Sequence, residues 1–136
     1  QAGTLSANPV AMCAGLAMLR RLDDGSVYTR LDSLGARLET AVAGIPHLAV
    51  QRVGSIFWFC LTAHGRPALP IRRTAAAPAD ASASYARVYH PLLEAGIYLA
   101  PSAWEVGFLS MAHTEADVDR LADTLGKAVR ATLPEA

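Results

Sequence analysis

The sequence predicts an α+β fold, in which a small antiparallel or mixed sheet of three or four strands carries helices on one face. Three observations support this class. Apolar residues recur at helical spacing in four segments. The run from Ile56 to Leu61 is apolar throughout, as expected of a central strand. Turn residues separate the segments and give the order helix, helix, strand, strand, loop, helix, strand, strand, helix.

Two helices open the chain. After a short N-terminal loop, Asn8 is expected to cap the first helix and Pro9 to occupy its first position. Gly25 can adopt the left-handed conformation that ends such a helix. The second helix is predicted over residues 26–42, with an apolar stripe of Val27, Leu31, Leu34, Leu38 and Val42.

Two strands are predicted next, at residues 47–53 and 55–62, on either side of Gly54. In the first of them, the pattern alternates, so Leu48 and Val50 should share one face. The second lacks polar residues over most of its length and should lie in the centre of the sheet.

A loop rich in proline and alanine is predicted at residues 63–80, with a short edge strand at residues 69–72. The third helix is expected over residues 81–95. Pro91 lies inside this helix and should kink it or delay its start, because proline lacks the N–H of the helical ladder.

The last third of the chain is predicted to contain two short strands and a helix. The strands, at residues 97–99 and 108–111, flank a loop at residues 101–107. Thr114 and Asp117 form a capping-box pattern at the start of the final helix. The buried stripe of that helix should be Val118, Leu121, Leu125 and Val129.

Composition excludes some classes of function. Twelve basic and twelve acidic residues give a net charge of zero, which argues against binding to nucleic acid. No apolar run reaches the roughly 18 residues that span a bilayer. Cys13 and Cys60 lie in apolar runs outside any CxxC motif, so we expect two buried free thiols and a cytoplasmic protein. The chain starts at Gln1 rather than methionine, which suggests a processed product or a piece of a longer protein.

Chemical motifs are few. The four histidines, His47, His64, His90 and His113, lack metal-ligand spacing, so no metal site is expected. No nucleophile elbow and no phosphate-binding glycine loop occurs. Tyr85 and Tyr89 lie four residues apart and indicate a packing stripe.

Two segments remain as candidate sites. A turn containing Gly3 and Thr4 precedes the first helix and could hold a phosphate, although an ordinary helix-capping loop is the simpler interpretation. The loop before Gly107 carries Trp104 and Glu105, and a plain surface loop with Trp104 beneath it is again the alternative.

These two segments carry a resemblance to a known family. Residues 3–12 (GTLSANPVAM) and 100–114 (APSAWEVGFLSMAHT) resemble two segments of the class III aminotransferases, in the form found in glutamate-1-semialdehyde aminomutases. The resemblance extends over nearly the whole chain and is weak only at residues 63–84.

The resemblance implies the small C-terminal domain of a fold type I enzyme that depends on pyridoxal 5'-phosphate. Residues 1–24 would form the cofactor-phosphate loop and an interdomain helix, and residues 25–136 the small domain. The family forms homodimers with active sites at the subunit interface. Gly3 and Thr4 would reach the cofactor phosphate of the neighbouring subunit. Glu105 would face a small amino-acid substrate, where related aminotransferases place an arginine.

The implied reaction converts glutamate-1-semialdehyde to 5-aminolevulinate, for tetrapyrrole synthesis. The family's Schiff-base lysine and pyridinium-binding aspartate lie before the segments matched here, and Lys127, the only lysine, is outside any matching motif. We therefore expect no catalytic residue in this chain, no covalently bound cofactor, and a fragment that is inactive without a large N-terminal domain.

The chain also departs from the family pattern. Ala7 stands where glycine is common and Trp104 where phenylalanine is, Pro91 is unusual in its helix, and residues 57–60 are bulkier than usual. Two alternatives therefore stay open. One is a class III aminotransferase with a different amino donor, and the other is a non-catalytic α+β binding or dimerisation module.

Overall fold

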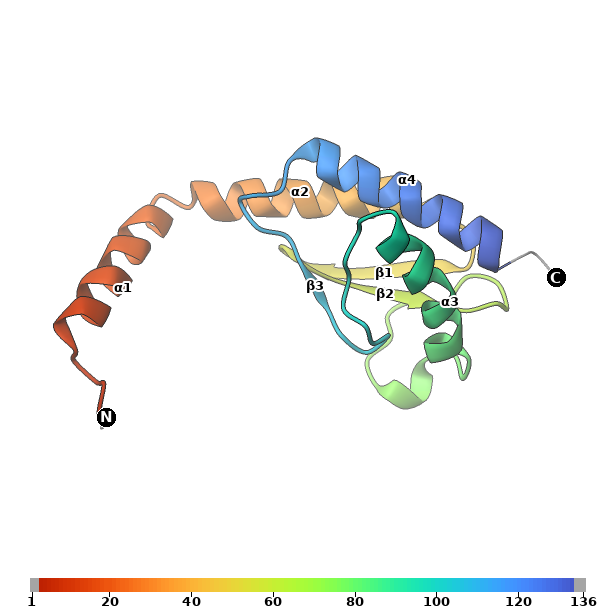
Figure 1. The fold of residues 1–136 in the computed structure, drawn as a ribbon, viewed down its shortest axis with the longest axis horizontal. Helices are drawn as coiled ribbons and strands as arrows, with labels where there is room; N and C mark the ends of the chain where they lie inside the picture. Colours follow the sequence, from red (N-terminus) through yellow and green to blue (C-terminus); the bar gives the residue numbers. More distant parts are fainter. Residues whose placement is uncertain (1–2, 134–136) are drawn as a thin grey trace.

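The computed structural model describes residues 3–133 and confirms the α+β class (Figure 1). A long helical arm precedes a layer of helices on a small sheet. In chain order the elements are α1 (Pro9–Leu22), α2 (Ser26–Val42), β1 (Leu48–Val53), β2 (Ile56–Leu61), the short 3-10 helix η1 (Thr74–Ala76), α3 (Ala81–Glu94), β3 (Gly107–Phe108) and α4 (Glu115–Thr132).

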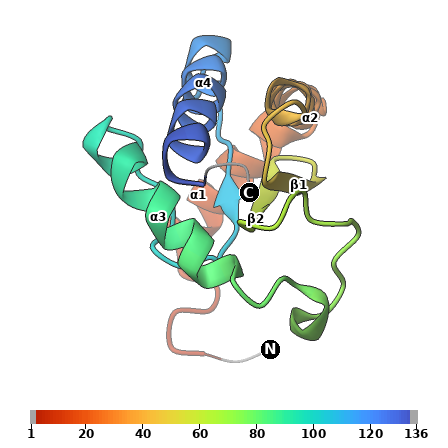
Figure 2. The ribbon, with the colours of Figure 1, turned by 90° about the vertical axis from the view of Figure 1, so that its right-hand side faces the viewer.

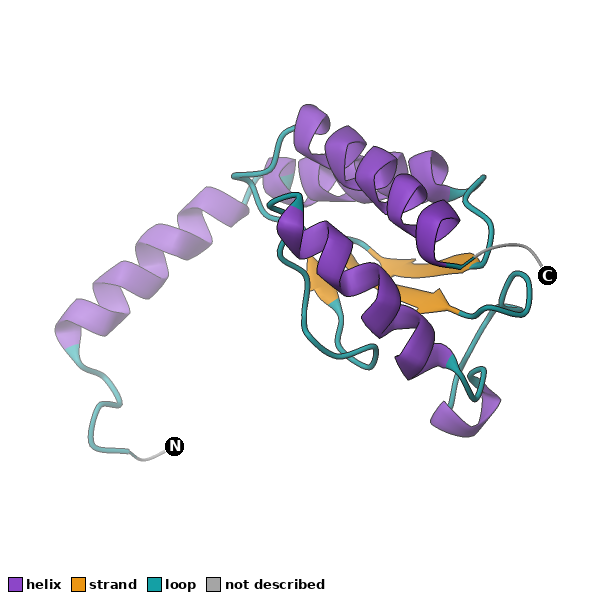
Figure 3. Cartoon of the chain, turned by 45° about the vertical axis from the view of Figure 1, so that its right-hand side comes forward, coloured by secondary structure: helices purple, strands orange, loops and turns teal. Residues whose placement is uncertain are grey.

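The sheet has three antiparallel strands in the order β1-β2-β3. β1 and β2 form a hairpin in which Leu48 pairs with Leu61 and Val53 with Ile56. Gly54 makes the turn with a φ of 58°, a conformation that glycine adopts without strain. Helices α2, α3 and α4 lie over one face of the sheet, as the sequence predicts (Figure 3). The other face meets the 63–80 loop, where the Gln51 side chain donates to the Ile71 carbonyl.

The core lies between that sheet face and the three helices. The side chains of Leu48 and Val50 both point into this core, as the alternation in β1 predicts. On β2 every second side chain, at Phe57, Phe59 and Leu61, points into the same core. The helices close the core with apolar side chains that are almost fully buried, among them Leu34, Leu38, Val88, Leu92, Val118 and Leu125.

Helix α1 stands apart from this core. Asn8 caps it through its side-chain oxygen, which accepts from the Val10 and Ala11 N–H groups, as predicted. None of its residues is buried, and it extends away from the sheet (Figures 1 and 2). The prediction of a buried Cys13 is wrong, because that thiol is exposed on this helix, whereas Cys60 is buried on β2.

Ion pairs join α2 to α4. Arg37 holds Asp119 in a bidentate contact, with Nη2 2.6 Å from Oδ2, and Arg30 pairs with Glu115 at 2.9 Å. All four side chains are more than one third exposed. Such pairs contribute little to stability, so they orient two helices that the core already holds together. The predicted capping box of α4, between Thr114 and Asp117, is present.

Three predictions about the loops and short strands are wrong. Residues 69–72 form no edge strand, because Pro70 cannot donate to a ladder and the Ile71 backbone bonds to the Gln51 side chain instead. Residues 97–99 also lack strand pairing, although Ile97 and Leu99 pack against the core.

The strand predicted at 108–111 is present only as the two-residue β3. A turn ends it early, in which the His113 N–H donates to the Ser110 carbonyl. Helix α3 runs from Ala81 to Glu94, so Pro91 lies within it and does not delay its start.

Asp80 ties the end of β2 to the start of α3. Its carboxylate accepts hydrogen bonds from the Thr62 hydroxyl, the Ala63 N–H and the Ser84 hydroxyl, at 2.7–2.8 Å. Burial acts to raise the pKa of Asp80, but these three donors outweigh it and lower the pKa from 3.8 to about 2. The carboxylate therefore stabilises the folded chain in its ionised form.

A first prediction concerns Gly35 on α2. A Cβ there would lie 2.4 Å from the Gly54 carbonyl oxygen, so Gly35→Ala must push the helix off the hairpin. We expect the free energy of unfolding to fall by about 2 kcal/mol, as for other overpacked sites. Gly44→Ala is the matched control, since nothing lies within 4 Å of its Cβ, and it should change stability by less than about 0.5 kcal/mol. Equal denaturation midpoints for the two variants would contradict the close approach.

A second prediction concerns pH. Because the pKa of Asp80 is depressed on folding, its contribution is complete above about pH 4 and is lost as the pH falls towards 2. Asp80→Asn should lower the free energy of unfolding by about 2 kcal/mol at pH 7. The difference from wild type should shrink steadily between pH 4 and pH 2 in urea titrations. A difference that stays constant over that interval would exclude the ionised carboxylate as the cause.

Candidate functional site

Glu105 lies in the loop between α3 and β3. The loop turns at Ser102, whose hydroxyl oxygen accepts from the Trp104 N–H at 3.2 Å and whose carbonyl accepts from the Glu105 N–H at 3.3 Å. A serine hydroxyl that caps the backbone two residues on is a common way to close such a turn. The local sequence thus folds this loop without help from a regular strand.

Both ends of the loop are fixed to the core. Before it, the Tyr85 hydroxyl donates to the Ala100 carbonyl at 2.6 Å. Burial, with a smaller effect of Tyr89, raises the pKa of Tyr85 to about 12, so this hydroxyl stays protonated as a donor. After it, Gly107 pairs with Phe57, and a Cβ on Gly107 would lie only 2.2 Å from the Phe57 ring. Glycine is therefore required where the loop rejoins the sheet.

The Glu105 side chain itself is exposed. Among residues 3–133, its carboxylate takes part in no ion pair. On α4, by contrast, Glu115 and Asp119 are paired with arginines. Residues 3–133 thus present a carboxylate on an anchored loop without a cationic partner from the same stretch of chain.

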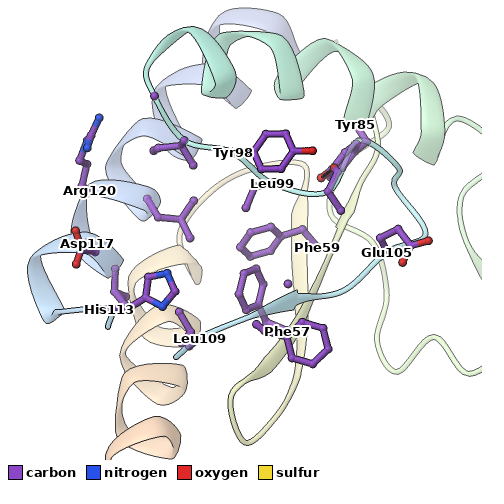
Figure 4. Close-up of a pocket in the computed structure, with 17 residues that line it drawn as sticks. Phe57, Phe59, Tyr85, Tyr98, Leu99, Glu105, Leu109, His113, Asp117 and Arg120 are labelled. Atoms are coloured by element: carbon purple, nitrogen blue, oxygen red, sulfur yellow. Dashed lines mark hydrogen bonds between the residues drawn. The ribbon is translucent and has the colours of Figure 1, made fainter. Parts of the chain in front are cut away.

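A pocket of about 430 Å³ lies beside the loop (Figure 4). The rings of Phe57 and Phe59 lie in its middle, and Glu105 is at one end. The charged groups Asp117 and Arg120 are at the other end. Both are already engaged, because Asp117 accepts from the Thr114 backbone and hydroxyl and Arg120 donates to the Ala95 carbonyl at 2.6 Å. The middle of the pocket is apolar, and within residues 3–133 the Glu105 carboxylate on its lining enters no ion pair.

Gly3 and Thr4 form an exposed turn before α1, closed by the Ser6 N–H donating to the Gly3 carbonyl at 3.0 Å. The turn lies at the far end of α1, remote from the Glu105 loop (Figure 1). The structure therefore does not bring Thr4 and Glu105 together within one chain. The turn has exposed donors that suit a phosphate group, and it would have to serve a site completed by other polypeptide.

Lys127 does not belong to either segment. It lies on α4 with its Nζ 2.7 Å from the Asp123 carboxylate, and it does not line the pocket beside Glu105. The described residues therefore fit a pyridoxal phosphate group only in part: they include a turn that suits its phosphate, but no amine placed to bind its aldehyde carbon.

Other kinds of site have little support. Over residues 3–133, no three histidine, cysteine, aspartate or glutamate side chains gather closely enough to hold a metal ion. Within the same range, every helix is too short or too polar to cross a membrane.

Sequence reasoning missed the roles of two residues, on α3 and β2, that anchor the loop. Tyr85 was expected only to pack, and it does stack on Tyr89, with ring centroids 6.2 Å apart, but its hydroxyl also holds Ala100. Trp58 was regarded as part of an apolar strand, yet its indole N–H donates to the Ala103 carbonyl at 2.7 Å. The alternation of β2 contained a signal, because it places Trp58 on the face opposite Phe57 and Phe59.

Comparison with known proteins adds to this geometry. No protein-family profile matches the chain. The chain is 44% identical over 135 residues to the glutamate-1-semialdehyde 2,1-aminomutase of Opitutus terrae, an alignment that covers 95% of the chain and 30% of that protein. The chain thus spans about 30% of the length of the curated relatives it matches.

Two solved structures share the fold. An omega-transaminase from Sphaerobacter thermophilus superposes with a TM-score of 0.73 at 28% identity, over 96% of this chain and 30% of that one. A transaminase with PLP bound gives a TM-score of 0.62 at 28% identity, over 99% and 30% of the two chains. Over nearly all its length, the chain therefore corresponds to the C-terminal portion of the glutamate-1-semialdehyde 2,1-aminomutases and has the fold of that portion of a transaminase.

Proposed function

We propose that this chain is the C-terminal part of a pyridoxal-phosphate-dependent aminomutase that converts glutamate-1-semialdehyde to 5-aminolevulinate, in the cytoplasm, for tetrapyrrole synthesis. The observation that carries the proposal is the exposed Glu105 carboxylate on an anchored loop, with no ion pair to any described residue, in a chain 44% identical to such an aminomutase. That loop is one of the two segments in which the sequence resembles the family.

In this proposal the chain supplies binding groups to a site completed by other polypeptide. The Gly3–Thr4 turn donates its hydroxyl and backbone N–H groups to the cofactor phosphate, across a subunit interface. Glu105 faces the substrate and disfavours a second substrate carboxylate by charge repulsion. The cofactor, when bound, supplies the electron sink for the movement of the amino group. The amine that holds it comes from outside this chain, so the isolated chain is inactive.

The exposed apolar side chains of helix α1 support the proposal that other polypeptide covers this helix. Its exposed apolar side chains are Val10, Met12, Leu16, Met18 and Leu19, each at least 49% exposed. A helix with apolar side chains around most of its circumference is normally covered by other polypeptide. We therefore propose that residues 1–24 form the connection to a large cofactor-binding domain and to the second subunit of a homodimer, and that residues 25–136 form the small domain.

A second candidate is a transaminase with a different amino donor. The two solved structures that share the fold are both transaminases, at 28% identity. The difference between the two candidates lies in which substrates the Glu105 end of the pocket accepts. One substitution, Glu105→Arg, tests both candidates.

Glu105→Arg in the full-length enzyme should shift turnover from the aminomutase reaction towards transamination with a dicarboxylate, because the arginine attracts the carboxylate that Glu105 repels. A change in the ratio of the two kcat/KM values of about tenfold or more is expected, corresponding to at least about 1.4 kcal/mol. The ratio is measured by following 5-aminolevulinate and the keto-acid product in parallel.

Glu94→Arg is the matched control for this substitution. Glu94 is also exposed, but it lies at the end of α3 and does not line the pocket. It should leave the ratio unchanged. If Glu105→Arg and Glu94→Arg behave alike, Glu105 does not contact substrate. If the wild-type enzyme transaminates but forms no 5-aminolevulinate, the second candidate replaces the first.

Thr4→Val should weaken retention of the cofactor in the full-length dimer, because valine keeps the shape of threonine but removes the hydroxyl. The expected loss is about 1–3 kcal/mol, for one hydrogen bond to a charged group. Equilibrium dialysis of the cofactor measures the loss. Thr4→Ser keeps the hydroxyl and should retain most of the affinity. Equal affinities for the valine and serine variants would remove Thr4 from the phosphate site.

A further inference from the structure

Trp58 reaches from the sheet to the loop that carries Glu105. It lies in the middle of β2, on the face opposite Phe57 and Phe59, and its side chain is half-buried there. The sheet face that it occupies has no helix over it. On that face its indole meets the loop that carries Glu105, at Ala103 and Trp104.

Two contacts join Trp58 to that loop. The Nε1–H donates to the Ala103 carbonyl at 2.7 Å, across 45 residues of sequence. The ring of Trp104 stacks on it at a centroid distance of 6.5 Å and an interplanar angle of 21°. Ala103 is only 7% exposed, so its carbonyl has little access to water if the indole N–H is removed. The two residues held are those directly before Glu105.

The loop has other anchors on either side of the carboxylate. Tyr85 holds Ala100, five residues before Glu105, and Gly107 begins the β3 ladder two residues after it. The turn at Ser102 rests on two longer hydrogen bonds, of 3.2 and 3.3 Å. Of the two described side chains outside the loop that hydrogen-bond to its backbone, Tyr85 and Trp58, Trp58 acts closer to Glu105 in the sequence.

We propose that Trp58 is a positioning residue for Glu105: its hydrogen bond to Ala103 and its stack on Trp104 hold the loop in the one conformation that presents the carboxylate at the end of the pocket. This rests on the proposed role of Glu105 in substrate selection. Without the indole N–H, the loop samples further conformations, and the carboxylate discriminates less well between substrates with one and two carboxyl groups.

The experiment uses the full-length enzyme and Trp58→Phe, which keeps a smaller aromatic ring for stacking and removes the indole N–H donor. We expect amide hydrogen exchange at residues 103–107 to accelerate. The ratio of aminomutase to transamination kcat/KM should fall roughly three- to tenfold, the range that one net hydrogen bond gives. Val42→Ala controls for lost stability, since Val42 is a buried core residue of α2 outside the pocket, and it should change neither the exchange at 103–107 relative to the rest of the chain nor the ratio.

A double-mutant cycle separates this inference from the proposed function. In a Glu105→Arg background, Trp58→Phe should have no further effect on the ratio, because the group it positions is gone. Unchanged exchange at 103–107, or a change in the ratio that simply adds to that of Glu105→Arg, overturns the positioning role. If Glu105→Arg itself leaves the ratio unchanged, the proposed function fails, and the positioning role fails with it even if exchange accelerates.

Discussion

The contact between Gly107 and the ring of Phe57 is the constraint on which the candidate site depends. β3 has only two residues, so it adds little ladder of its own. It can lie against β2 because Gly107 has no side chain and the ring fills that space. The same ring lies in the middle of the pocket, and the loop enters β3 immediately after Val106. Because Gly107 has no Cβ, the Phe57 ring can lie in the pocket wall, and the loop that carries Glu105 can end against β2.

The chain combines a body that closes its own core with an arm that does not. Helices α2, α3 and α4 and the sheet bury a continuous apolar cluster, whereas α1 buries nothing. Helix propensity and the Asn8 cap specify α1 locally. Burial of its exposed apolar side chains against another surface would lower the free energy further. This division agrees with a chain that spans about 30% of the length of its relatives.

The sequence predicted the elements whose signals are local. The caps at Asn8 and Thr114 mark helix starts that the structure confirms, and the alternation of β1 placed Leu48 and Val50 in the core. The strand expected at residues 97–99 failed, because apolar alternation shows burial but not whether a neighbouring strand is present to pair with. The prediction that Cys13 is buried failed for a similar reason: a local pattern does not reveal whether the polypeptide that covers an apolar helix belongs to the same chain. Gly3, Thr4 and Glu105 came from resemblance, and the roles of Tyr85 and Trp58 were out of reach because their bonds span 15 and 45 residues.

The stacked indoles have a practical consequence. The chain contains two tryptophans, Trp58 and Trp104, and both belong to the stack beside Glu105. One is half-buried and the other is 47% exposed, so they differ in contact with water. The ultraviolet emission excited at the red edge of indole absorption therefore originates, within this chain, from this one stacked pair of indoles. Quenching of this tryptophan fluorescence, or a shift of its emission maximum, therefore reports on ligands that bind near Glu105, and no added label is needed.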